Sequence, residues 1–169
     1  MNDHDQNISS YIGVFKKSGF SARIVLILAT WFGSGFLPLA PGTWGSLLSL
    51  PFAVGAYNSG FIYSCLFLAL ILILSIPISG AAAIIFHRED PPPVVIDETA
   101  GIFVTLFFIP LSWTGIITGF VLFRLFDILK PFPIGLIDKK LKGGAGIVLD
   151  DIIAGIYANI CLRLILNII

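Results

Sequence analysis

The chain has 169 residues, of which 57% are hydrophobic and only 12% charged, and its formal net charge is zero. An ordinary soluble domain carries roughly 25% charged residues, so the composition excludes that class and indicates an integral membrane protein. The length permits one domain with several membrane spans, because each helical crossing needs about 20 predominantly apolar residues. A second domain does not fit.

The N-terminal segment is polar. It holds Asp3, Asp5, Lys16 and Lys17 and has no apolar core that ends in a small-residue cleavage site, so it does not read as a signal peptide. We therefore expect a polar N-terminal tail over residues 1–20, followed by a single helical membrane domain over residues 21–169.

Glycines and prolines between residues 33 and 43 interrupt the first apolar stretch, residues 24–57. They would end one helix before another begins at Trp44, with Thr43 as its N-cap. Non-helical backbone at membrane depth is tolerated only where it is buried in protein or lines a cavity. We therefore expect a re-entrant or interfacial half-helix, followed by a crossing helix.

Three further apolar stretches follow. Residues 61–86 and residues 146–169 are each long enough for one crossing. Residues 94–129 are too long for one span, and the turn residues at 110–113 predict a helical hairpin. The predicted fold class is all-α: a polytopic membrane helical bundle with about four crossings plus the half-helix.

Loop charge predicts the orientation of the bundle. Nine of the ten basic residues flank one set of helix ends, and the opposite turns at residues 58–60 and 111–113 carry none. By the positive-inside rule the basic side, with the N-terminus, is cytoplasmic. Most carboxylates lie on that side. Placing an ionised carboxylate near lipid costs free energy, so such a group more often belongs to a functional site than to a surface without function.

Three acidic groups at different helix ends are the candidate site: Asp97/Glu98, Asp127 and Asp150/Asp151. Arg124 and Lys130 lie three residues on either side of Asp127, so the three share a helical face. A cation pair around a carboxylate suits phosphate bound beside a metal. Oxygen ligands without a His/Cys set favour Mg²⁺. In the competing interpretation the charges only mark the membrane–water interface at the helix ends. This alternative is strongest for Asp138 and for Glu89/Asp90.

Two glycine-containing segments are the other candidates. The segment with Gly42, Thr43, Gly45 and Ser46 could offer free helix amides to an anion, or it could be a tight packing turn. The glycines that end at Gly146 could likewise cradle phosphate or only let the chain turn.

Read together, four segments resemble, in order and at similar spacing, the motifs of the phosphatidylglycerophosphatase A family. They are residues 32–46, 95–101, 123–134 and 144–155. The resemblance implies an all-helical, Mg²⁺-dependent phosphatase that removes the terminal phosphate of phosphatidylglycerophosphate at the cytoplasmic face of the bacterial inner membrane. The substrate is then a phospholipid in the bilayer, and we expect neither a nucleic-acid partner nor an obligatory protein partner.

The hypothesised mechanism uses one or two Mg²⁺ ions. The expected metal ligands are Glu98, Asp127 and Asp151, with Asp97 and Asp150 binding directly or through a neighbour. Lys130 and Arg124 would bind phosphate oxygens, and Asp138 and Gly146 would support them. A carboxylate from the set Asp127, Asp150 and Asp97 either attacks phosphorus or orients an attacking water, and we favour water.

Three alternatives compete with the phosphatase. The motifs of the CDP-alcohol phosphotransferases and of the acid-phosphatase-like lipid phosphatases are absent. A small ion- or proton-coupled transporter predicts charges near the middle of spans. A non-catalytic assembly protein would account for the glycine motifs, which permit close helix packing. It would not account for the charged helical face of Arg124, Asp127 and Lys130.

Overall fold

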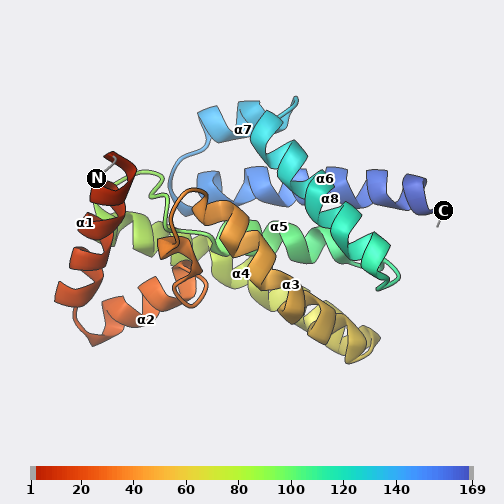
Figure 1. Cartoon of the computed structure of the whole chain (residues 1–169), viewed down its shortest axis with the longest axis horizontal. Helices are drawn as coiled ribbons and strands as arrows, with labels where there is room; N and C mark the ends of the chain where they lie inside the picture. The colour runs from red at the N-terminus through yellow and green to blue at the C-terminus, as the bar shows by residue number, and fades with distance from the viewer. Residues whose placement is uncertain (1–2, 168–169) are drawn as a thin grey trace.

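The computed structural model describes residues 3–167, and every regular element in that range is helical (Figure 1). This confirms the predicted all-α class. The elements are α1 (Asp3–Lys17), α2 (Phe20–Ala29), the 3-10 helix η1 (Ser34–Phe36), α3 (Pro41–Asn58), α4 (Phe61–Phe86), α5 (Ile96–Leu106), α6 (Trp113–Leu129), α7 (Ile134–Lys140) and α8 (Gly143–Leu166).

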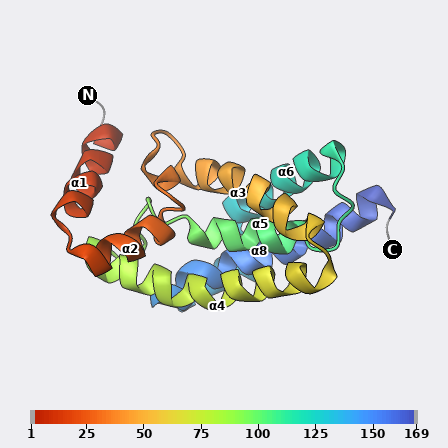
Figure 2. The ribbon, with the colours of Figure 1, turned by 90° about the horizontal axis from the view of Figure 1, so that it is seen from below.

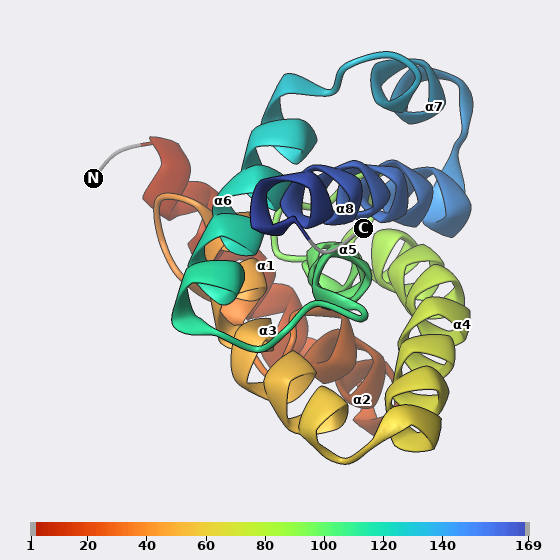
Figure 3. The same cartoon turned by 90° about the vertical axis from the view of Figure 1, so that its right-hand side faces the viewer.

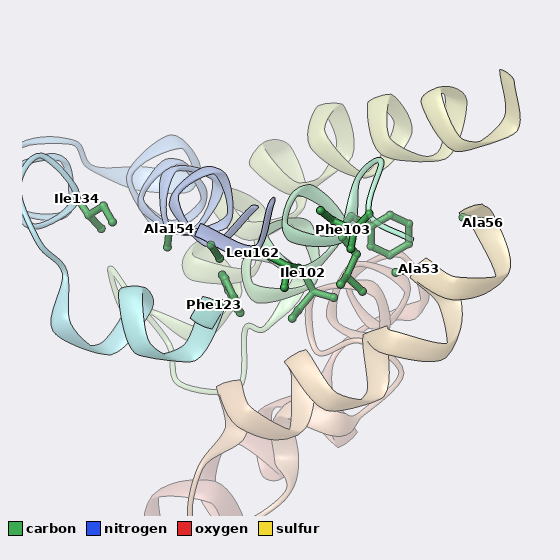
Figure 4. Close-up of a cluster of buried hydrophobic side chains, with 11 residues drawn as sticks. Ala53, Ala56, Ile102, Phe103, Phe123, Ile134, Ala154 and Leu162 are labelled. Atoms are coloured by element: carbon green, nitrogen blue, oxygen red, sulfur yellow. The ribbon is translucent and has the colours of Figure 1, made fainter. Parts of the chain in front are cut away.

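Helix α5 is the centre of the bundle, with α3, α4, α6 and α8 packed around it (Figure 3). Apolar side chains from these helices form the core shown in Figure 4, in which Ile102, Phe103 and Phe123 are buried. Small residues set the close approach of α5 and α8, because a Cβ at Gly155 would meet the carbonyl oxygen of Gly101. Glycines at such positions let helix backbones pack closely.

Two helices, α4 and α8, are long and apolar enough to cross a membrane. Helix α4 has 26 residues and is about 39 Å long. Only 11% of its most apolar window is buried in the protein, so its outer face is left uncovered. Its limits agree with the apolar stretch over residues 61–86.

The predicted hairpin is present, but its first arm is short. Helix α5 has 11 residues, about 16 Å, which is about half the thickness of a bilayer's hydrocarbon core. Side chains from α8 satisfy the carbonyl groups at its end: the Asn159 amide donates to three of them, and Arg163 donates to Phe107, Phe108 and the Asn159 oxygen. The return helix α6 starts after Ser112, whose hydroxyl caps it.

The N-terminal part differs from the predictions in two respects. Residues 3–17, expected to be a polar tail, form α1, which lies across one end of the bundle and packs on α4 (Figures 1 and 2). Tyr11 of α1 packs edge-on against Phe86, with ring centroids 4.9 Å apart. The expected N-cap at Thr43 is wrong: α3 begins at Pro41 after Ala40, because proline is well suited to the first turn of a helix.

Candidate active site

A cavity of about 500 Å³ opens at the end of the bundle where α3, α5 and α8 begin and α6 ends. Helix α7 and residues 88–94 complete its wall. Ten of the predicted site residues line it: Gly42, Asp97, Glu98, Arg124, Asp127, Lys130, Asp138, Gly146, Asp150 and Asp151. Segments that lie up to about a hundred residues apart in the sequence therefore meet in one place.

Three carboxylates form the deepest part of the site. One oxygen each from Asp97, Glu98 and Asp151 lies within 4.8 Å of the others. The first two are in the first turn of α5, where the helix dipole favours negative charge, and Asp151 comes from the third turn of α8. Asp97 and Asp151 are buried.

This cluster is incomplete as a purely protein structure. The Oδ1 atom of Asp97 and the Oε2 atom of Glu98 are buried and have no hydrogen-bond partner among the described residues. Buried carboxylates side by side are costly unless a positive charge compensates them. Several closely spaced oxygen ligands are what a hard divalent cation such as Mg²⁺ requires, so the donor set fits that ion.

Arg124 and Asp127 are paired on the next wall of the cavity. The Arg124 Nη1 atom lies 2.6 Å from Asp127 Oδ2, one turn apart on α6, as the spacing predicted. The Arg124 Nε atom is buried and has no partner in the described part of the chain. A Cβ at Gly42 would overlap the Glu98 carboxylate and lie 3.2 Å from Arg124 Nη1. A larger residue at that position would therefore displace the Glu98 carboxylate.

Lys130 connects α6, α7 and α8. It ends α6 in the left-handed conformation, and its ammonium group donates to Asp138 and to Asp150, each at 2.7 Å. Burial alone would lower the pKa of Lys130, but its bonds to these carboxylates outweigh that effect and raise the pKa. The structure thus places Asp138 in the site, whereas the sequence left an interfacial role open.

Three predicted phosphate-binding residues do not line the cavity: Thr43, Gly45 and Ser46. Gly45 is buried in the packing of α3, where a Cβ would lie 2.5 Å from the Val95 Cβ. The Ser46 hydroxyl donates to the Gly42 carbonyl at 2.7 Å and lies 3.5 Å from Arg124. These residues shape the wall behind the cavity.

The segment before α5 contributes more to the cavity than the sequence indicated. Arg88, Glu89 and Asp90 all line it. Burial raises the pKa of Asp90, and the nearby charge of Lys130 partly offsets this. The signal available in the sequence was the acidic pair followed by three prolines, which hold the connection to α5 in a fixed turn.

Comparisons with known proteins agree with this site. A family model described as phosphatidylglycerophosphatase A matches residues 27–166. A Haemophilus influenzae phosphatidylglycerophosphatase A is 43% identical over 136 residues, which are 79% of this chain and 83% of that protein. The Escherichia coli phosphatidylglycerophosphatase A is 37% identical over 134 residues, which are 78% of this chain and 77% of that protein.

A third relative has a different substrate in its name. A Bacteroides thetaiotaomicron protein with the provisional name phosphatidylinositol-3-phosphatase is 34% identical over 142 residues, which are 80% of this chain and 89% of that protein. No solved structure matches the chain. The family match spans the cavity from Gly42 to Asp151 and beyond, and it agrees with the apolar outer surfaces of α4 and α8. The chain belongs to the phosphatidylglycerophosphatase A family, and it is a phosphatase associated with the membrane.

Proposed function

We propose that the chain hydrolyses the terminal phosphomonoester of phosphatidylglycerophosphate in a Mg²⁺-dependent reaction, giving phosphatidylglycerol and inorganic phosphate. The observation that carries the proposal is the cluster of Asp97, Glu98 and Asp151 in the same cavity as Arg124 and Lys130. One oxygen each of Asp97 and Glu98 has no hydrogen-bond partner among the described residues. Metal ligands and phosphate-binding cations are the parts that phosphoryl transfer needs.

The cluster carboxylates would hold the metal, with Asp127 and Asp150 beside them. A bound Mg²⁺ ion would neutralise charge on the phosphate and on the departing glycerol oxygen. The Arg124 Nε atom has no hydrogen-bond partner among the described residues. The Arg124 guanidinium would donate to a phosphate oxygen, as would the Lys130 ammonium group. The backbone at Gly42, at the start of α3, provides an amide in the first turn for the same anion.

Asp150 is the carboxylate that we assign to the attacking water. Its Oδ2 atom accepts from Lys130, while Oδ1 is buried and has no partner among residues 3–167. This geometry fixes the side chain beside Lys130, and a water in the cavity would transfer its proton to the second lone pair of Oδ2, because Oδ1 is shielded from solvent. In the proposed step a water oxygen bonds to phosphorus, the bond from phosphorus to the glycerol oxygen breaks, one proton of the water goes to Asp150, and the departing glycerol oxygen takes up a proton from solvent to become the hydroxyl of phosphatidylglycerol.

The topology that accompanies this proposal has α4 and α8 as full crossings. Helices α3 and α6, with 18 and 17 residues, would be the other two, and α2 would be the half-helix. The basic end of the bundle, the cavity and the N-terminus would then all face the cytoplasm. The membrane would be a bacterial inner membrane. The transporter alternative gains no support, because α4 contains no charged residue and the cavity lies at one end.

Phosphate release from phosphatidylglycerophosphate by the purified protein tests the proposal. We expect activity with Mg²⁺, none after EDTA treatment, and recovery when Mg²⁺ is added back. Glu98→Gln should abolish turnover, whereas Glu89→Gln, which changes an exposed acidic residue of the same cavity, should keep most of it. Activity that is insensitive to EDTA would refute the proposed Mg²⁺ requirement. Faster turnover of phosphatidylinositol 3-phosphate than of phosphatidylglycerophosphate would refute the proposed substrate.

A further inference from the structure

A group of three exposed cations lies where α1 meets α2, away from the cavity. Lys16 and Lys17 are in the last turn of α1, and Arg23 is in the first turn of α2. The Arg23 guanidinium donates to the Lys16 carbonyl oxygen at 2.6 Å, which holds the two helix ends together. None of the three forms an ion pair with a carboxylate of the described side chains, whereas Arg124 and Lys130 in the cavity both do.

The outer face of α2 next to these cations is apolar. Phe20, Ile24 and Ile27 are exposed, and their spacing of four and three residues places them on one side of the helix. Leu26 and Ala29, on the other side, are buried. Phe20 is 82% exposed and lies in the sequence between Lys17 and Arg23. An apolar stripe with cations at its edge is typical of a helix at a membrane interface.

The position of α2 agrees with that pattern. It packs on α4, the helix whose apolar outer face is uncovered, and α1 crosses the end of the bundle (Figures 1 and 2). The apolar stripe of α2 thus adjoins the surface that faces lipid, and the cations lie at its end. A phosphate group of a lipid headgroup is the anion found at that depth, which favours lipid over an acidic protein segment as the occupant.

We propose that the corner formed by Lys16, Lys17, Phe20 and Arg23 binds the headgroup phosphates of anionic phospholipids in the surrounding leaflet. The three cations pair with the headgroups, and the apolar stripe of α2 inserts beside the acyl chains. This site is separate from the cavity and does not depend on the reaction proposed for it. It keeps anionic lipid enriched beside the protein.

The test uses the full chain reconstituted in vesicles, with Cys65 and Cys161 replaced by alanine and a fluorophore on Ser21→Cys. Trace amounts of phosphatidylglycerol or phosphatidylcholine with a spin label near the headgroup then quench the fluorophore. We expect at least twofold stronger quenching by the anionic lipid, decreasing at high salt. A fluorophore on Ser59→Cys, in the turn at the other end of the bundle, should show no preference.

The variant K16Q/K17Q/R23Q should lose the preference and change its melting temperature little, because the three side chains are exposed and the hydrogen bond lost is that from Arg23 to the Lys16 carbonyl. The matched control K139Q/K140Q removes two exposed cations of α7 and should retain the preference. Equal quenching by the two lipids in the parent protein, or no quenching by either, would overturn the proposal. A preference that persists in the triple variant would overturn it as well.

Discussion

The ion pair between Lys130 and Asp150 gives the sharpest prediction, because its two partners differ in exposure. The Lys130 side chain is 31% exposed and that of Asp150 only 7%. Lys130→Met keeps the apolar stem of the side chain and removes the ammonium group. Asp150 then has no hydrogen-bond donor among the side chains described, since its other oxygen already lacks one.

A buried carboxylate without a partner is strongly destabilising. Breaking a buried pair costs about 3–5 kcal/mol, and the partial exposure of Lys130 favours the lower end, about 3 kcal/mol. For a protein of this size that corresponds to a fall of about 6–12 °C in melting temperature. The double variant Lys130→Met/Asp150→Asn removes the stranded charge and should regain most of this loss. It should stay inactive, because the proposed reaction uses both side chains.

Thermal unfolding in detergent, followed together with phosphate release, checks both parts of this prediction. Lys142→Met is the matched control, since Lys142 pairs with Glu89 at 2.9 Å but both side chains are more than 70% exposed. An exposed pair contributes less than about 1 kcal/mol, so this variant should melt near the parent. If the double variant were less stable than Lys130→Met alone, the assignment of a stranded charge to Asp150 would be wrong.

Three further predictions test other parts of the structure. Gly42→Ala should lower kcat/KM at least about tenfold, or about 1.4 kcal/mol, because its methyl group would displace Glu98. Gly13→Ala, which meets no atom within 4 Å, should leave phosphate release unchanged, and equal rates for the two variants would contradict the steric argument. Asn159→Leu should cost about 1–3 kcal/mol in thermal unfolding, because the Thr105 carbonyl loses its side-chain donor and Arg163 loses the Asn159 oxygen; an unchanged melting temperature would refute this. Asp97→Asn should raise the Mg²⁺ concentration for half-maximal activity by at least about 10-fold, and an unaltered Mg²⁺ titration would exclude Asp97 as a ligand.

The helices that end at strong local signals could be predicted from the sequence. The limits of α4 follow from an uninterrupted apolar run that starts after Gly60 and ends before His87. The end of α5 could not be predicted in this way, because the apolar run continues past Leu106 to Ile109. Asn159 and Arg163, more than fifty residues further along the chain, satisfy its carbonyls. Only the tertiary structure shows such a contact.

The site was predictable at the level of which helix ends meet, and less so at the level of which atoms pair. Carboxylates at the ends of apolar runs converge in the cavity as expected. The sequence assigned Lys130 to phosphate and left Asp138 between a supporting and an interfacial role, but it did not predict that the two form an ion pair. Helix α7, which carries Asp138, is a seven-residue helix whose position depends on packing against α8. Periodicity is a weak guide for an element that short.

The adjacent residues Asp150 and Asp151 connect the two halves of the site. Successive residues on a helix point about 100° apart, so the two carboxylates of α8 serve different neighbours. Asp151 reaches the cluster with Asp97 and Glu98 on α5, and Asp150 reaches Lys130 at the end of α6. Because both belong to one turn, α8 links the acidic cluster to Lys130 at the end of α6. The close packing of α8 on α5 at Gly155 and Gly101 therefore positions the chemistry as well as the core.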